Sequence, residues 1–283
     1  MTEIKLSIGY DEYEAGQQMD QKLEELANTP EAAQLSKLVI GDWGGTYENS
    51  SEHIVETLVR LKDRFPALRS LFIGDMDSEE CEVSWIMQSD LNPLFAAFPD
   101  LQSLTIKGST DLALGQVEHA KLEELIIICG GLPSEVLASV AQAKLPALRK
   151  LELYIGVENY GFNGNLEYIL AVAKPGLFPK LVYLGLKNSE LQDEIAAALA
   201  QSDILDQLET LDLSEGTLTD TGAEALLASE KIRRLQALDL HHHFMSEAMT
   251  RKVAELLPQA DVSDREETDK YNGEEYRYPA LTE

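Results

Sequence analysis

Basic residues are scarce in this chain. Its 283 residues include 23 lysines and arginines against 50 aspartates and glutamates, which gives a formal net charge of −27. Such a surface repels phosphates and anionic lipid, so the charge argues against a nucleic-acid partner and against a membrane surface. It favours basic partners or cations, although solubility alone also accounts for a strongly acidic surface.

Cysteine, long apolar runs and a basic leader are also missing or nearly so. Cys81 and Cys129 are the two cysteines of the sequence. Their separation indicates reduced, buried thiols rather than a disulfide framework. The first residues, "MTEIKLSIGYDEYEAG", carry no basic segment followed by an apolar one, and no later run is long enough to span a bilayer. We therefore expect a cytoplasmic location.

Motifs for phosphate binding or nucleophilic catalysis are absent from the sequence. The glycine-rich stretches "GDWGGTYENS", "CGGLPS" and "GVENYGFNGN" contain neither a phosphate-loop lysine nor a dinucleotide fingerprint. No nucleophile stands at a recognisable spacing from a base. We predict no catalytic residue and no cofactor, and the sequence favours a non-enzymatic role without deciding the question.

Leucine, by contrast, is abundant and periodic. One phrase recurs eight times, at intervals of roughly 21 to 33 residues: leucine, two residues, leucine, one residue, then leucine or isoleucine. The copies are Leu35–Leu38–Ile40, Leu68–Leu71–Ile73, Leu101–Leu104–Ile106, Leu122–Leu125–Ile127, Leu148–Leu151–Leu153, Leu181–Leu184–Leu186, Leu208–Leu211–Leu213 and Leu235–Leu238–Leu240. Each copy predicts a short strand that must stack on its neighbours to bury its leucines.

Helical patterns separate the phrases. "HIVETLVRLKDRF" places Ile54, Leu58 and Leu61 on one helical face, and "SEAMTRKVAELLP" begins at a capping serine and ends at a proline. Alternating strands and helices predict an α/β solenoid, a horseshoe of about eight irregular repeats. Its curved parallel sheet would form the concave face and its helices the convex face.

These phrases resemble the leucine-rich repeat superfamily in its ribonuclease-inhibitor-like style, and "LETLDLSEGTLTDTGAEALL" carries the resemblance most fully. "LFIGDMDSEECEVSWI", "SEGTLTDTGAEALLAS" and "LDLHHHFMSEA" are further similar to a family of small bacterial leucine-rich repeat proteins with no established activity. The resemblance therefore implies a fold and a bacterial origin. One departure concerns the position three residues after each phrase, where the superfamily has Asn or Cys. Here it holds Trp43, Met76, Ser109, Gly130, Gly156, Ser189, Gly216 and His243.

The predicted boundaries follow from the repeats. We expect one solenoid domain over residues 1–283, with repeats from 33 to 258. Residues 1–32 contain a strand pattern, "IKLSIGY", and a helix pattern, "QQMDQKLEELA", and would cap the first repeat. Residues 259–283 are acidic and would form a short strand near Val262 and then a cap or a tail, with disorder after Asp264 as the alternative.

The predicted concave face is uneven, and it suggests the function. Its expected partner-binding residues are Phe72, Ile126, Ile128, Tyr154, Asp212, Asp239 and His241. Apolar residues gathered on such a face favour a contact site, unless the inserts after Trp43 and Met76 cover them. We therefore predict a protein-interaction module that binds a protein or peptide of basic character.

The histidines of "LDLHHHF" support an alternative. Asp212 and Asp239 occupy equivalent positions in adjacent repeats, and His241 lies diagonally from Asp212, so the three could hold a divalent metal or perform acid–base chemistry. They could equally form an acidic strip with His241 as a counter-charge. On a continuous strand His241 and His243 would point alike and His242 the other way. Since His243 stands at the turn position of its repeat, a structural role is the simpler expectation for it.

Overall fold

The structure is a computed structural model, and it describes residues 2–282. The chain divides into two compact units, which are described separately. The first contains residues 2–128 together with Gln142–Leu148, and the second contains Cys129–Ala141 and Arg149–Thr282. Within the described residues no helix is both long and apolar enough to cross a membrane.

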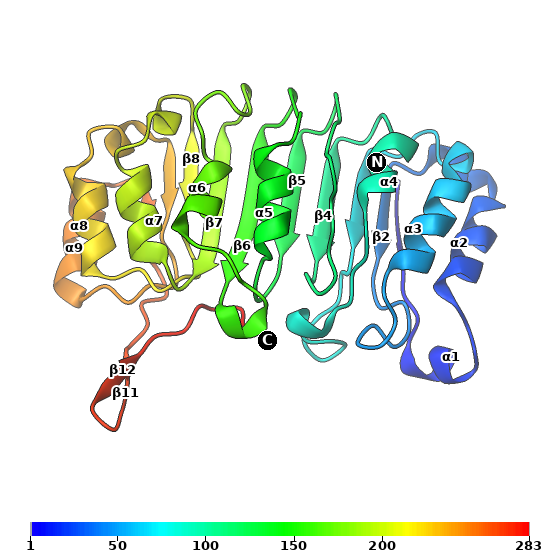
Figure 1. The fold of residues 1–283 in the computed structure, drawn as a ribbon, viewed down its shortest axis with the longest axis horizontal. Coiled ribbons are helices and arrows are strands. Elements are labelled where there is room, and N and C mark those ends of the chain that lie inside the picture. The colour runs from blue at the N-terminus through cyan, green and yellow to red at the C-terminus, as the bar shows by residue number, and fades with distance from the viewer. Residues whose placement is uncertain (1, 283) are drawn as a thin grey trace. The chain divides into compact units, whose positions relative to one another are not determined.

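Five parallel strands form the sheet of the first unit, in chain order, and helices lie along one face of them (Figure 1). The strands are β1 (Glu3–Leu6), β2 (Lys37–Ile40), β3 (Ser70–Ile73), β4 (Ser103–Lys107) and β5 (Glu124–Ile128). The helices are α1 (Tyr10–Glu14), α2 (Met19–Ala27), α3 (Glu52–Arg60) and α4 (Asn92–Ala97). The strand and helix predicted before the first repeat are β1 and α2.

The second unit repeats this arrangement. Its parallel strands are β6 (Lys150–Gly156), β7 (Tyr183–Ser189), β8 (Thr210–Asp212), β9 (Ala237–Asp239) and β10 (Ala260–Asp261). Its helices are α5 (Ser134–Ala141), α6 (Leu166–Ala171), α7 (Gln192–Leu199), α8 (Asp220–Ala228) and α9 (Glu247–Leu256). An antiparallel hairpin follows, β11 (Asp269–Tyr271) and β12 (Glu274–Tyr276). Asn272 and Gly273 both have positive φ, as a two-residue hairpin turn requires.

The second leucine of each of the eight phrases lies on a strand, and within each unit the strands are in register. The second leucine of each phrase pairs with the same leucine of the next strand within a unit, as in Leu71 with Leu104 or Leu184 with Leu211. These leucines are at most 1% exposed. The stacked rows bury apolar area that no single repeat could bury alone, and each fully buried leucine contributes roughly 1.5–3 kcal/mol. The prediction of an α/β leucine-rich repeat fold is confirmed.

Other groups perform the task of the missing asparagine ladder. Trp43 donates its indole N–H to the Asn49 carbonyl at 2.8 Å. Gln192 donates to the Leu186 carbonyl at 2.9 Å and accepts from the Ser189 N–H at 3.3 Å. Gly216 leaves room for it, since a β-carbon there would overlap the Gln192 amide. In these two repeats, turn backbone is therefore satisfied by side chains other than a ladder asparagine.

Candidate functional site

The open face of each sheet, meaning the face opposite the helices, carries the residues that the sequence analysis selected. In the first unit, Phe72, Thr105 and Ile126 lie side by side on β3, β4 and β5. All three are partly exposed, and so is Ile128 two residues further along β5. A shallow hollow of about 390 Å³ opens over Phe72 and Ile126. The inserts therefore do not fully cover these apolar side chains.

Charged groups surround this hollow. Lys37 and Arg69 contribute on one side, and Glu123 and Glu124 on the other. An apolar centre with a polar rim is the usual anatomy of a protein-binding surface. The hollow therefore combines the two apolar side chains of Phe72 and Ile126 with charged neighbours.

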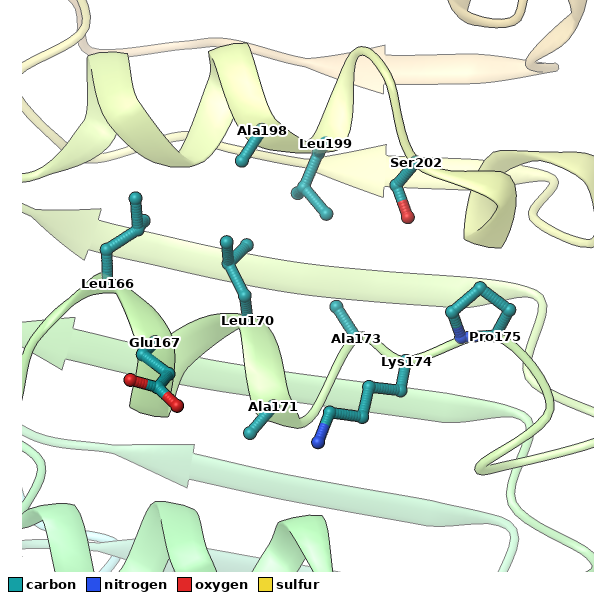
Figure 2. A pocket seen from close by; sticks show the side chains of 10 residues that line it. All are labelled: Leu166, Glu167, Leu170, Ala171, Ala173, Lys174, Pro175, Ala198, Leu199 and Ser202. Carbon is teal, nitrogen blue, oxygen red and sulfur yellow. The ribbon is translucent and has the colours of Figure 1, made fainter.

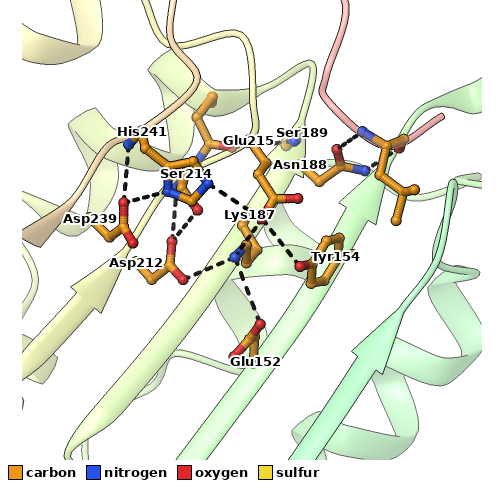
Figure 3. Close-up of polar contacts among 12 residues, drawn as sticks. Glu152, Tyr154, Lys187, Asn188, Ser189, Asp212, Ser214, Glu215, Asp239 and His241 are labelled. Carbon is orange, nitrogen blue, oxygen red and sulfur yellow. Dashed lines mark hydrogen bonds and ion pairs between the residues drawn. The ribbon is translucent and has the colours of Figure 1, made fainter. Parts of the chain in front are cut away.

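In the second unit, a buried lysine stands at the centre of the predicted acidic strip (Figure 3). Lys187 of β7 is 5% exposed. Its ammonium lies 2.8 Å from Glu215 Oε1, 3.2 Å from Asp212 Oδ2 and 3.7 Å from Glu152 Oε1. It also lies 4.9 Å from the centre of the Tyr154 ring. We name the group of Glu152, Tyr154, Lys187, Asp212 and Glu215 the Lys187 cluster.

The register of the strands creates the cluster. Tyr154 pairs with Lys187, and Glu152 and Asp212 occupy the same row on either side of Gly185. Gly185 has no side chain to fill that row, and a β-carbon there would lie 3.1 Å from Glu152 Cγ. The long side chain of Lys187 therefore reaches carboxylates on both neighbouring strands.

Every oxygen of the Asp212 carboxylate is engaged. Tyr183 donates its hydroxyl to Oδ2 at 2.6 Å, and Ser214 donates its hydroxyl and its N–H to Oδ1 at 2.6 and 3.0 Å. Burial opposes the charged carboxylate, but Lys187 and these donors lower the pKa of Asp212 below its ordinary value. Asp212 is 2% exposed, so a partner cannot reach it without displacing this network.

Tyr154, Lys187 and the neighbouring Tyr183 all have raised pKa values. Burial, followed by the nearby carboxylates, raises the pKa of Tyr154 and of Tyr183 well above the ordinary value. Burial works against the ammonium of Lys187, but Asp212 and Glu215 outweigh it and raise its pKa. None of these three groups is placed to exchange a proton near neutral pH, so the geometry indicates positioning rather than acid–base chemistry.

Asp239 and His241 lie at the more open end of this face. Asp212 and Asp239 are paired in register, as the sequence predicts. The His241 Nδ1 atom lies 2.7 Å from Asp239 Oδ1, and its Nε2 atom lies 3.7 Å from Glu215 Oε1. Burial alone would lower the pKa of His241, but Asp239 and Glu215 raise it. The side chains of Asp239 and His241 are 34% and 28% exposed and remain within reach of a partner.

The three histidines point in three directions. Strand β9 ends at Asp239, and His242 has a left-handed φ of 53°, so His241 and His243 do not share a face. The continuous strand on which His241 and His243 would point alike is therefore not formed. His243 is fully buried, accepts from the Met245 N–H at 3.2 Å and donates to the Val262 carbonyl at 3.1 Å. The structural role expected for His243 is confirmed.

The geometry gives no support to a metal centre at Asp212, Asp239 and His241. Between residues 2 and 282, no group of three or more His, Cys, Asp or Glu side chains has a metal-binding arrangement. The ammonium of Lys187 stands where a cation would have to bind the carboxylates. A second cation at that position would meet strong repulsion.

Sequence reasoning missed Lys187, Glu152 and Glu215. Lys187 and Glu152 could have been found from the sequence, because the strand register places them on neighbouring strands, one row apart on the same face. Glu215 could not have been found in this way, because its left-handed φ of 63° is set by the loop and not by the repeat pattern of leucines.

A different hollow, of about 560 Å³, lies on the helix side between α6 and α7 (Figure 2). Leu166, Leu170 and Leu199 line it together with Glu167, Lys174 and Ser202.

These features define the class of the protein as an α/β leucine-rich repeat protein. The chain is 36% identical to a protein of Bacteroides fragilis of known structure, with a TM-score of 0.90, and the match covers 98% of this chain and 77% of that one. The chain belongs to the same family of leucine-rich repeat proteins as that bacterial protein.

Two further solved structures show much weaker similarity. An internalin of Listeria monocytogenes is 14% identical over 82% of this chain and 73% of its own, with a TM-score of 0.31. The leucine-rich repeat domain of APL1 is 13% identical over 86% of this chain and 78% of its own, with a TM-score of 0.24. No protein-family model and no curated protein matches the chain.

Proposed function

We propose that this protein is an interaction module that binds a protein or peptide partner on the open face of its sheet. The observation that carries the proposal is the hollow over Phe72 and Ile126, which combines an apolar centre with a charged rim. Such a surface gains free energy when an apolar partner side chain displaces its water. Ile128, on the same strand as Ile126, extends the apolar surface.

The partner is expected to be basic. The net charge of −27 attracts basic proteins over the whole surface, and Asp239 and Glu215 keep partly exposed carboxylates on the second unit. Tyr154 donates its hydroxyl to Glu215 at 3.2 Å and offers a partly exposed aromatic ring. Because Asp212 is buried and fully paired, it supports the site by fixing Lys187 rather than by contacting the partner.

A displayed peptide library tests the proposal without requiring that the partner be identified first. We expect selection on the wild-type protein to enrich peptides with one large apolar residue and several lysines or arginines. The variant Phe72→Ser should bind them at least about tenfold more weakly, because loss of an anchor contact costs more than about 1.4 kcal/mol. Tyr168→Ser is the matched control, since Tyr168 is an exposed aromatic residue of helix α6. Equal losses in both variants, or enrichment of no sequence, would contradict the proposal.

A further inference from the structure

The C-terminal segment of the second unit returns to the sheet after the hairpin of β11 and β12. Figure 1 shows the hairpin projecting away from the strands and the last residues running back toward them. Residues Tyr278–Thr282 then pass across the ends of three successive strands, β9, β8 and β7. Three successive strands span two strand spacings, roughly 10 Å, and the three residue steps from Tyr278 to Leu281 can cover that distance.

Each of the three repeats supplies one contact to the main chain of this segment. The His242 Nε2 atom lies 3.2 Å from the Tyr278 carbonyl oxygen. The Ala280 N–H donates to the Glu215 carbonyl at 2.8 Å. Asn188 binds both groups of Leu281: its Nδ2 donates to the carbonyl at 2.5 Å, and its Oδ1 accepts from the N–H at 2.8 Å.

The three contact residues share an uncommon backbone conformation. Asn188, Glu215 and His242 have φ values of 57°, 63° and 53°, and each stands two residues after the third leucine of its repeat phrase. This left-handed region is uncommon for residues other than glycine, and Asn and His adopt it more readily than Glu; residues held in it often cluster at binding sites. Its repetition in three repeats indicates one continuous feature, which we name the strand-end groove.

The groove receives main chain closely and side chains selectively. Pro279 is buried, whereas Tyr278 and Ala280 are exposed and Leu281 is partly exposed. Gly130 allows the close approach of the last residue, since a β-carbon there would lie 2.5 Å from the Thr282 carbonyl oxygen. Main-chain hydrogen bonds with one selective pocket are the mode by which proteins bind extended peptides.

The arm that carries the segment is loosely attached. The residues of β11 are all exposed, and Tyr271 is 70% exposed. Ion pairs such as that of Arg277 with Glu275 join residues of the arm to each other. An exposed arm held largely by its own pairs opens at low cost, so the segment can leave the groove without unfolding the repeats.

We infer that the strand-end groove is a peptide-binding site, that Tyr278–Thr282 is its resident ligand, and that it takes an extended segment of a partner protein with an aromatic residue, a proline, a small residue and an aliphatic residue in that order. The chain's own segment shows which chemistry fits. Because it is part of the same chain, this segment competes with a partner's segment at a high effective concentration. This site is separate from the hollow over Phe72, and either can fail without the other.

The test uses the full-length protein with its tail released. Ala280→Pro removes the N–H that binds Glu215 and should free the segment, which hydrogen exchange at the Leu281 amide reports. A fluorescent peptide of residues 274–282 is then titrated by anisotropy. We expect it to bind the Ala280→Pro protein at least tenfold more tightly than the wild type, in which the groove is occupied. A peptide that itself carries proline at the position of Ala280 should not bind.

Asn188→Gly in the Ala280→Pro background locates the site. Glycine keeps the left-handed backbone without strain and removes the carboxamide, so peptide binding should be lost while the thermal unfolding midpoint stays close to that of the parent. If the unfolding midpoint of Asn188→Gly falls, the variant Asn188→Asp is used in its place. Aspartate keeps the oxygen that accepts from the Leu281 N–H and loses only the N–H that donates to the Leu281 carbonyl.

Two results would overturn the inference: no peptide binding by the released protein, or binding that Asn188→Gly does not weaken. The segment would then be a terminal cap only, or the peptide would bind elsewhere. If the wild-type protein forms dimers as its concentration rises, and excess peptide dissociates them, then the segment that binds the groove comes from a second copy of this chain and not from another protein.

Discussion

The Lys187 ammonium lies 3.2 Å from the Asp212 carboxylate, and both side chains are almost fully buried on the open face of the second unit. A carboxylate expected to meet a basic partner therefore has an internal cation as its partner. Asp239 and Glu215, by contrast, keep partly exposed carboxylates on the same face.

Removing this internal cation should destabilise the protein strongly. Lys187→Met leaves Asp212 buried without its counter-charge, which typically costs about 3–5 kcal/mol. Urea unfolding measures the loss. Lys231→Met is the matched control, because Lys231 pairs with the exposed carboxylates of Asp203 and Asp206, and such pairs contribute about 0–1 kcal/mol. Similar losses in the two variants would show that the cluster is not a buried ion network.

The two aspartates of the predicted strip should respond differently to charge reversal. Asp212→Lys places a second ammonium beside Lys187 in a buried site, so we expect the protein not to fold. Asp239→Lys changes a partly exposed residue and should keep the fold. It should also weaken the binding of basic peptides selected on the wild type, with a smaller loss at higher salt. Anisotropy at low and moderate salt checks this, and unchanged affinity would remove Asp239 from the binding surface.

His241 and His243 should titrate on opposite sides of the ordinary histidine value. Asp239 and Glu215 raise the pKa of His241 against the effect of burial, whereas burial lowers the pKa of His243. Nuclear magnetic resonance of the imidazole nitrogens measures both values. Asp239→Asn should bring the pKa of His241 down and leave His243 unchanged, and a shift of both would mean that the variant disturbs the fold.

These shifts predict two stability changes with pH. The protonated His241 is favoured by folding, so its contribution is present below the ordinary histidine pKa and is lost as the pH rises through the raised value. Folding favours neutral His243, so its contribution is present above the ordinary value and is lost as the pH falls toward the lowered value. Unfolding midpoints measured against pH check this. His241→Gln should lose the decrease in stability above the ordinary histidine pKa, and His243→Gln should lose the decrease in stability below it.

A pair of glycines separates backbone strain from steric overlap. Gly156 and Gly176 have φ values of 71° and 80°, but a β-carbon at Gly156 would overlap the Gly130 carbonyl oxygen, whereas Gly176 faces open space. Gly176→Ala should cost about 1–2 kcal/mol from strain alone. Gly156→Ala should cost more, about 3 kcal/mol or above, because backbone must move. Equal costs in denaturant unfolding would show that the loops at Gly130 and Gly156 yield easily.

The leucine phrases determined the repeats by themselves. Burying alternate leucines requires stacked parallel strands, so Leu71, Leu104 and their equivalents predict β2 to β9 and the register that aligns them. The pairing of Asp212 with Asp239 follows from the same register. Local sequence was sufficient here because every repeat obeys one rule, namely that its apolar face needs a neighbour.

The tertiary structure alone decided which polar groups remain available. The Lys187 side chain reaches Asp212 because Gly185 leaves the row between Glu152 and Asp212 free of a side chain, and this contact makes Asp212 unavailable to a partner. The direction of His243 depends on the left-handed backbone at His242. The contact between Asn188 and Leu281 joins residues far apart in the chain, and no periodicity encodes it. Periodic patterns describe neighbours along a repeat, whereas burial and pairing of charges depend on long-range contacts that only the folded chain creates.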